Sequence, residues 1–157
     1  MNRDIFEYRN LVLTNYFKDR TWDDNPEFRL MRSLVLDTEG WRSQYPYLIE
    51  YEWEVDPGHS NMGVGDLVFT DGDTEFAVVE VKFVDTMSSG RNKRNKRTKK
   101  RRQVEWQAYQ YCQLYNDRIT QVIPDASVKG YFFTDETPTP RLMRYYASGI
   151  EQQLWFE

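Results

Sequence analysis

Cysteine and histidine are almost absent from this 157-residue chain, which contains one of each, Cys112 and His59. A single cysteine excludes an intramolecular disulfide bond and a zinc site built from several cysteines. No apolar run approaches the ~20 residues needed to span a bilayer, and the first ten residues lack the apolar stretch of a signal peptide. We therefore expect a soluble, intracellular protein without a membrane partner, in which any metal ion is held mostly by oxygen ligands.

Acidic residues are missing from residues 91–102, although the whole chain has 25 Asp and Glu residues and 21 Lys and Arg residues. This stretch, RNKRNKRTKKRR, is called the basic segment below. It holds nine of the basic residues, so the rest of the chain carries a net charge of −13. The net charge of −4 therefore hides one strongly cationic segment on an acidic protein.

The basic segment has three possible roles: a loop kept soluble by its charge, a nuclear import signal, or an arm that grips phosphate groups. If the host is eukaryotic, or the protein is viral in a eukaryotic host, we expect a nuclear location, and otherwise a cytoplasmic one. As an arm, the segment would supply strong, salt-dependent affinity for DNA, or alternatively RNA. The expected phosphate contacts are Arg91, Lys93, Arg94, Lys96, Arg97, Lys99, Lys100, Arg101 and Arg102.

The apolar content of 39% is sufficient for a hydrophobic core, and the length favours a single domain over residues 1–157. Hydrophobic periodicity predicts a helical N-terminal part over residues 1–46 and a core over 47–135. Within the core, the patterns predict strands at 47–55, 64–70, 75–83 and 127–134, a mobile loop at 84–102, a helix at 103–116, and a short edge strand at 142–146. We therefore expect an α/β fold with a central mixed sheet of four to five strands flanked by helices.

The second and third predicted strands carry the residues of greatest chemical interest. A hairpin connection lays Asp66 against Glu80 and Lys82, which point to the same face because they are two residues apart on a strand. Charges in a strand otherwise built from Val, Ala and Phe cost several kcal/mol each unless they are paired or bind a metal. The simpler interpretation is a structural salt bridge between Lys82 and one of the two carboxylates.

The segments GVGDLVF (63–69), FAVVEVK (76–82) and QAYQY (107–111) together resemble motifs of the PD-(D/E)XK nuclease superfamily. Asp66 stands at the position of the motif's aspartate, and Glu80-Val81-Lys82 matches its (D/E)-x-K half. Gln107 and Tyr111 are similar to the Q-x-x-x-Y motif of the RecB-like branch, and a Holliday-junction-resolvase or VRR type is an alternative. The resemblance implies a restriction-endonuclease-like core: a helix, three strands, a helix and a fourth strand.

The same resemblance implies roles for these residues. Asp66, Glu80 and the backbone carbonyl of Val81 would hold Mg²⁺ or Mn²⁺, and Lys82 would orient or help to deprotonate the attacking water. Gln103 and Gln107, four residues apart on one helix face, would reach the scissile phosphate or the lysine, with ordinary surface glutamine as the alternative for Gln103.

A further acidic ligand is not singled out by spacing. Glu7 and Glu27 are candidates from the helical part, with solvated helix surface as the alternative for both. Glu50, Glu52 and Glu54 lie on one predicted strand face, where the residue nearest Asp66 would touch a second ion or all three would be solvated. His59 is a further candidate ligand, although its loop position departs from the pattern of RecB-like enzymes.

The sequence thus predicts a metal-dependent nuclease that hydrolyses phosphodiester bonds, with DNA as the expected substrate. Two alternatives stay open: a catalytically inactive nucleic-acid-binding domain of the same fold, and a protein-interaction module. Because the chain has no room for a helicase or a separate specificity domain, a homodimer or a larger DNA-processing complex is a plausible setting.

Overall fold

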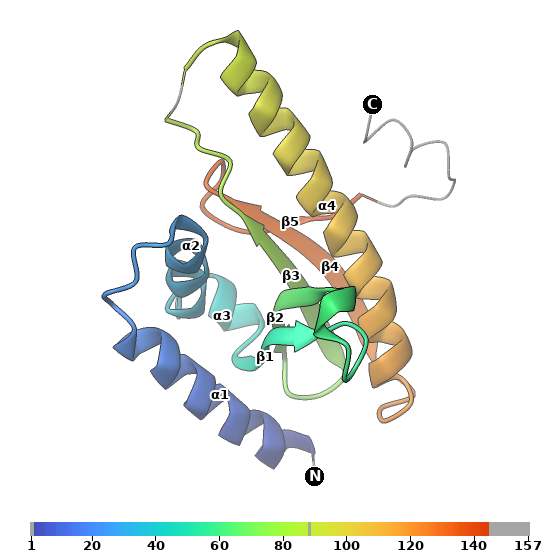
Figure 1. Ribbon diagram of the computed structural model, residues 1–157. Coiled ribbons are helices and arrows are strands. Elements are labelled where there is room, and N and C mark those ends of the chain that lie inside the picture. The colour runs from blue at the N-terminus through green and yellow to red at the C-terminus, as the bar shows by residue number, and fades with distance from the viewer. Residues whose placement is uncertain (1, 88, 145–157) are drawn as a thin grey trace.

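Helices surround a central five-stranded sheet in the computed structural model, which describes residues 2–87 and 89–144 (Figure 1). The elements are α1 (Asn2–Asp19), α2 (Pro26–Val35), α3 (Trp41–Gln44), β1 (Tyr47–Glu54), a 3-10 turn (Ser60–Met62), β2 (Val64–Thr70), β3 (Glu75–Lys82), α4 (Arg91–Ile119), β4 (Ser127–Thr134) and β5 (Arg141–Leu142). The predicted α/β class, with a mixed sheet of four to five strands flanked by helices, is confirmed.

The strands follow one another across the sheet in the order β1-β2-β3-β4-β5. The first three are antiparallel neighbours, β4 runs parallel to β3, and β5 is antiparallel to β4. The parallel step from β3 to β4 requires a long crossover, which α4 supplies. Because α4 makes this crossover, it lies along one face of the sheet and its first turns extend past the end of β3 (Figure 1).

The strand β3 is buried on both faces, as its run of apolar residues predicts. Every residue from Phe76 to Val81 is buried. Its alternate side chains belong to two separate core clusters: Ala77 and Val79 pack with residues of α2 and α3, whereas Val78 packs with Tyr115 of α4. A strand enclosed in this way provides a rigid base for any polar group that it carries.

The N-terminal helices form where the sequence signals place them. The side chain of Asn25 caps α2 by accepting hydrogen bonds from the amides of Glu27 and Phe28, and Pro26 fills the first helical position, where a missing N–H is harmless. In α1, the side-chain oxygen of Asn10 accepts a hydrogen bond of 2.9 Å from the amide of Leu48, which ties the helix to the edge of β1.

The loop predicted for residues 84–102 is wrong for its second part, because α4 begins at Arg91. All nine basic residues of the basic segment therefore lie on a helix. Lys and Arg have favourable helix propensities, and neither Pro nor Gly occurs between residues 91 and 119. The packed C-terminal part of α4 nucleates the helix, and the basic segment continues it.

The regular alternation predicted for the first strand is also partly wrong. The pairing of β1 with β2 shifts register between Leu48 and Glu50, and Glu52 has a backbone φ of +51°. As a result Tyr51 contacts the core cluster on one face of the sheet, while Ile49 and Trp53 belong to the cluster on the other. Irregularities of this kind re-aim side chains, so the three glutamates of β1 do not form one continuous acidic face.

The predicted edge strand at 142–146 is shorter than expected within the described residues. Its described part, β5, pairs Leu142 with Tyr131 and Arg141 with Phe132, and residues 145 and 146 lie outside the described range. Across residues 2–87 and 89–144, no helix has both the length and the apolar character that crossing a membrane requires.

The residue just before Asp66 has to be glycine, because a neighbouring strand places a side chain directly against it. Gly65 lies opposite Trp53 in the β1–β2 register, and a Cβ placed on Gly65 would stand 2.3 Å from atoms of the indole ring. The indole in turn packs edge-on against Tyr111 and Tyr115 of α4. Gly65 therefore allows Trp53 to lie against β2 and to connect the sheet with α4.

We expect Gly65→Ala to lower the free energy of unfolding by about 1–3 kcal/mol, because the added methyl group displaces a packed ring. For a chain of this size that is a fall of several degrees in Tm. Val64→Ala is the matched control, since Val64 is 38% exposed and its truncation leaves the ring in place. Equal thermal stability of the two variants would contradict the packing described for Gly65.

Candidate active site

The strands β2 and β3 separate from each other at one end while both stay in the sheet. Their ladder ends at the pair formed by Leu67 and Val79. Beyond this point β2 still pairs with β1 as far as Val64, and β3 still pairs with β4 as far as Lys82. The opening between the two strands, called the fork below, contains Asp66 and Glu80.

Reciprocal hydrogen bonds between side chains and backbone fill the fork. The amide of Asp66 donates to Glu80 Oε2 over 3.0 Å, and the amide of Val81 donates to Asp66 Oδ2 over 2.7 Å. The two carboxylates thus replace the backbone ladder that the separated strands have lost. These bonds engage one oxygen of each carboxylate, and Asp66 Oδ1 and Glu80 Oε1 accept none within the described part of the chain.

Both carboxylates lie in an environment that disfavours negative charge. Glu80 is only 1% exposed, and burial together with the neighbouring charge of Asp66 raises its pKa well above the ordinary value. Burial raises the pKa of Asp66 to about 7, although the hydrogen bond from Val81 acts in the opposite direction. A half-buried and a buried acid therefore share the fork without a buried cation beside them in the described residues.

Lys82 lies at the end of β3 and is held by α2. Its Nζ is 3.5 Å from Glu27 Oε2, and the same carboxylate oxygen accepts a hydrogen bond of 3.2 Å from the amide of Phe83. The structural salt bridge considered for Lys82 therefore forms with Glu27 and not with Asp66 or Glu80. The ammonium group still acts on the fork, because its charge lowers the pKa of Asp66.

The structure separates the acidic candidates that the sequence left equivalent. The charges of Glu27 and Glu52 both raise the pKa of Asp66, so these two carboxylates act on the fork electrostatically. Glu7 is an exposed residue of α1. Glu50 instead pairs with Arg9 of α1, and Glu54 accepts a hydrogen bond from the amide of Gly58.

The histidine does not join the carboxylates. His59 Nδ1 lies 3.2 Å from Asp56 Oδ2 in the exposed loop before the 3-10 turn. Across residues 2–87 and 89–144, no group of three or more His, Cys, Asp or Glu side chains is arranged to hold a metal ion. The oxygen donors that the structure places together are the two carboxylates of the fork and the backbone beside them, including Val81.

The helix α4 brings part of the predicted glutamine motif to the same region. Gln107 Nε2 donates a hydrogen bond of 3.0 Å to the hydroxyl of Tyr111. That hydroxyl packs on Gly63, where an added Cβ would approach it to 2.6 Å. Burial raises the pKa of Tyr111, and the charges of the fork carboxylates act in the same direction. Gln103 is an exposed residue one turn closer to the helix N-terminus.

The basic segment is the N-terminal part of α4, whose first turns extend past the end of β3 (Figure 1). Six of its side chains are exposed: Arg91, Lys93, Arg94, Lys96, Lys99 and Arg102. Arg97 and Arg101 instead bind the body, Arg97 through the carbonyl oxygen of Asp85 and Arg101 through Glu136. The cations are therefore carried on a helix that is held to the chain after β3 and after β4, whereas a mobile loop was predicted.

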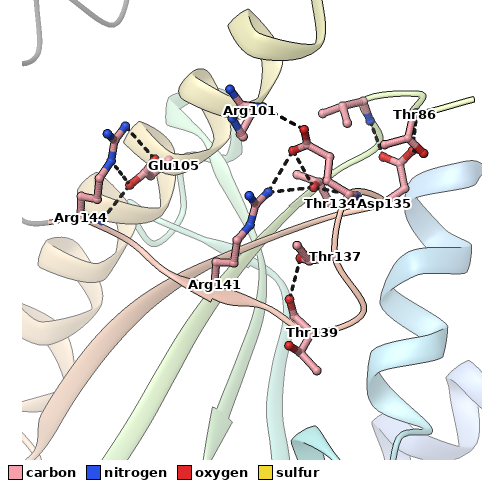
Figure 2. Close-up of polar contacts among 11 residues, drawn as sticks. Thr86, Arg101, Glu105, Thr134, Asp135, Thr137, Thr139, Arg141 and Arg144 are labelled. Atoms are coloured by element: carbon pink, nitrogen blue, oxygen red, sulfur yellow. Dashed lines mark hydrogen bonds and ion pairs between the residues drawn. The ribbon is translucent and has the colours of Figure 1, made fainter. Parts of the chain in front are cut away.

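Asp135, which follows β4, was not among the residues predicted from the sequence. It holds the backbone of the chain directly after β3. Its carboxylate accepts hydrogen bonds of 2.8 Å from the amides of Val84 and Thr86 (Figure 2). An acidic residue directly after a predicted buried strand is the only signal that would have indicated such a role. Asp135 thereby fixes where the chain turns from β3 toward the basic segment.

Comparison of the chain with models of known protein families, with curated proteins and with solved structures finds no match. Function therefore has to be inferred from the geometry of the fork and of α4.

The fork carboxylates should make stability depend on pH. Because the pKa of Asp66 is raised from 3.8 to about 7 by folding, the folded state favours the protonated acid, and stability is lost as the pH rises through this range. Glu80 acts in the same direction. We expect metal-free protein to lose a few kcal/mol between pH 5 and 8, and Asp66→Asn to lose clearly less.

Thermal unfolding in chelator at several pH values measures this difference. Glu39→Gln, which removes one exposed charge from the turn before α3, is the matched control and should follow the wild type. Parallel curves of Tm against pH for wild type and Asp66→Asn would show that the fork carboxylates are not held in an unfavourable environment.

Proposed function

We propose that the chain is a nuclease that uses Mg²⁺ or Mn²⁺ to hydrolyse phosphodiester bonds, with DNA as its substrate. The observation that carries the proposal is the pair of carboxylates in the fork, half-buried Asp66 and buried Glu80, with Lys82 at the end of the strand that carries Glu80. The order of elements, a helical part, three antiparallel strands, α4 and a parallel strand, also supports the resemblance to the PD-(D/E)XK superfamily.

The donor set of the fork suits a hard divalent cation. Two adjacent carboxylates with little exposure to water repel each other, and pairing with a cation or protonation is the usual way to relieve such a cost. Mg²⁺ and Mn²⁺ are bound through oxygen by one or two carboxylates, with water and substrate phosphate completing the shell, so a third acidic side chain is not required. Asp66 Oδ1, Glu80 Oε1 and the carbonyl oxygen of Val81 are the ligands we assign.

A divalent ion bound there supplies positive charge that acidifies a ligated water and stabilises negative charge on the phosphate. Lys82 is positioned to hold a water molecule or a phosphate oxygen at the mouth of the fork. Its ion pair with Glu27 is half-exposed and directs the ammonium group along the end of β3. Gln107 and Tyr111 close the fork on the side of α4 and offer further polar contacts to the substrate.

The charge distribution explains how an acidic protein would hold a polyanion. The body repels nucleic acid, whereas the basic segment attracts it and lies on the same helix that passes the fork, so encounter is steered to one part of the surface. Because the cations lie on a helix, their spacing is fixed at ~1.5 Å rise per residue. Bound phosphates are therefore placed relative to the fork.

An inactive nucleic-acid-binding domain is the second candidate, and one observation favours it. Both fork carboxylates already accept backbone hydrogen bonds, which stabilise the sheet without any metal ion. In that case the fork would be structural, and binding would depend on the basic segment alone.

Cleavage of plasmid DNA and of labelled oligonucleotides in Mg²⁺ or Mn²⁺ tests the proposal. We expect Asp66→Asn and Glu80→Gln to lower the rate by ~100-fold or more, because each removes an ionised oxygen donor while keeping the shape of the side chain. Lys82→Ala should lower the rate by ~100-fold through loss of the group that positions the attacking water or the phosphate oxygen. Glu39→Gln, which removes an exposed charge in the turn before α3, is the control and should retain wild-type activity.

Three results would separate the candidates. Activity that needs a divalent cation and is lost in both fork variants supports the nuclease. DNA binding without cleavage in either ion supports the inactive domain. Cleavage that persists unchanged in Asp66→Asn and Glu80→Gln contradicts the assignment of the fork as the active site.

A further inference from the structure

A second polar site lies on the other side of α4 from β2, where the helix passes β4 and β5. A pocket of about 310 Å³ is lined there by Arg101 and Arg102 of α4, by Arg141, by Arg144, by the carboxylate of Glu105 and by the ring of Phe132. We call it the arginine pocket. Two of its arginines belong to the basic segment, and the other two follow β4 in the chain and were not singled out by the sequence.

Two guanidinium groups of this pocket, those of Arg101 and Arg141, are held by the carboxylate of Glu136. Glu136, in the turn after β4, accepts hydrogen bonds of 2.9 Å from both Arg101 and Arg141 (Figure 2). Arg141 also donates to Thr134 Oγ1 over 3.1 Å, and its Cζ lies 4.6 Å from the centre of the Phe132 ring. Arginines fixed by carboxylates and by stacking bind anions at little cost in side-chain entropy.

The remaining carboxylate of the pocket is also occupied. Glu105 is only 3% exposed, and it accepts hydrogen bonds from the backbone amide of Arg144 at 2.8 Å and from its Nε at 3.0 Å. Arg101 and Arg141 share the single carboxylate of Glu136, so these two guanidinium groups have one carboxylate between them among the described residues. Within the described residues, Arg141 Nε is buried and has no hydrogen-bond partner.

A concave site lined by four guanidinium groups, two of which share one carboxylate, matches a tetrahedral oxyanion. Phosphate offers several acceptor oxygens and forms paired hydrogen bonds with arginine.

The position of the pocket relates it to the fork. Phe132 is the register partner of Glu80 in the parallel pair β3–β4, and β5 is the next strand beyond β4. At ~4.8 Å between neighbouring strands, β5 lies about 10 Å from β3 within the sheet. Because α4 stands between the fork and the pocket, a strand of nucleic acid bound at the fork would pass over the helix and place a phosphate several nucleotides away in the pocket.

We propose that the arginine pocket binds a phosphate group of a nucleic-acid strand, distinct from the phosphate that reacts at the fork. The phosphate is either a backbone diester or the monoester at a strand end. That this phosphate belongs to a nucleic acid rests on the proposed function. Binding of a phosphate group in the pocket does not itself require that the protein cleaves nucleic acid.

The first measurement is Tm of the full chain with inorganic phosphate, against chloride at equal ionic strength. Phosphate should raise Tm of the wild type more than chloride does, and this difference should vanish in Arg141→Gln. Arg94→Gln, which removes the same charge from the exposed start of α4, is the matched control and should keep the difference. An equal response to phosphate in the wild type, Arg141→Gln and Arg94→Gln would overturn the proposal.

The second measurement is oligonucleotide binding in chelator, which prevents metal-dependent cleavage. Arg141→Gln should weaken binding ~10-fold or more, and Arg94→Gln only about two- to threefold, the effect of losing one surface cation. A loss confined to 5′- or 3′-phosphorylated strands identifies a terminal monoester, and an equal loss for unphosphorylated strands identifies a backbone diester. Equal binding by the two variants would overturn the proposal even if the nuclease proposal holds.

A second variant protects the test against misfolding of Arg141→Gln. Arg102→Gln lines the pocket from an exposed position on α4 and should reproduce the loss of the phosphate response. Normal circular dichroism with a wild-type phosphate response in Arg102→Gln and in folded Arg141→Gln would count against the pocket. Absence of cleavage in every preparation, with the phosphate response intact, would remove the nuclease proposal and leave the pocket standing.

Discussion

The exchange of backbone pairing for carboxylate pairing between β2 and β3 is the interaction on which the described site depends. Where the two strands separate, the amides of Asp66 and Val81 lose strand partners and find carboxylate oxygens instead. An amide left unpaired in the interior costs about 1–3 kcal/mol, so the carboxylates stabilise the fork even though their own burial is unfavourable. The fork is thus stabilised by hydrogen bonds and destabilised by electrostatic repulsion at the same residues.

The surrounding fold keeps this balance in place. The strand β3 is enclosed on both faces and is paired with β4 up to Lys82, so Glu80 cannot turn toward solvent without disturbing the core. On the other side, Trp53 lies across Gly65 and packs against α4, which ties β1 and β2 to the helix. The same helix also carries the basic segment, and one element therefore links the fork with the most cationic part of the chain.

Much of this arrangement could be predicted from local patterns. The hairpin, the buried third strand and the positions of Asp66 and Glu80 follow from apolar runs and a turn signal that depend only on neighbouring residues. The nuclease-like chemistry assigned to them stays a prediction. The helix of the basic segment is not predicted, because a dense run of charges is typical of a mobile loop. The run is helical because it continues directly into the packed part of α4.

Tertiary contacts determine the features that the sequence could not give. Glu27 is distinguished from Glu7 only by the packing of α2 against the end of β3, since both are helical glutamates of similar surroundings in the sequence. The irregular backbone at Glu52 re-aims the glutamates of β1, and no turn residue marks it. Arg141 and Arg144 meet the basic segment only because β5 folds back beside α4.

The most direct test of the account is anomalous diffraction from crystals of the full chain soaked in Mn²⁺. We expect one strong peak in the fork, at a Mn²⁺ ion bound by an oxygen from each of Asp66 and Glu80 and by the carbonyl oxygen of Val81. Saturating Mn²⁺ with no peak in the fork, and with both carboxylates still bound to the backbone amides of the other strand, would contradict it.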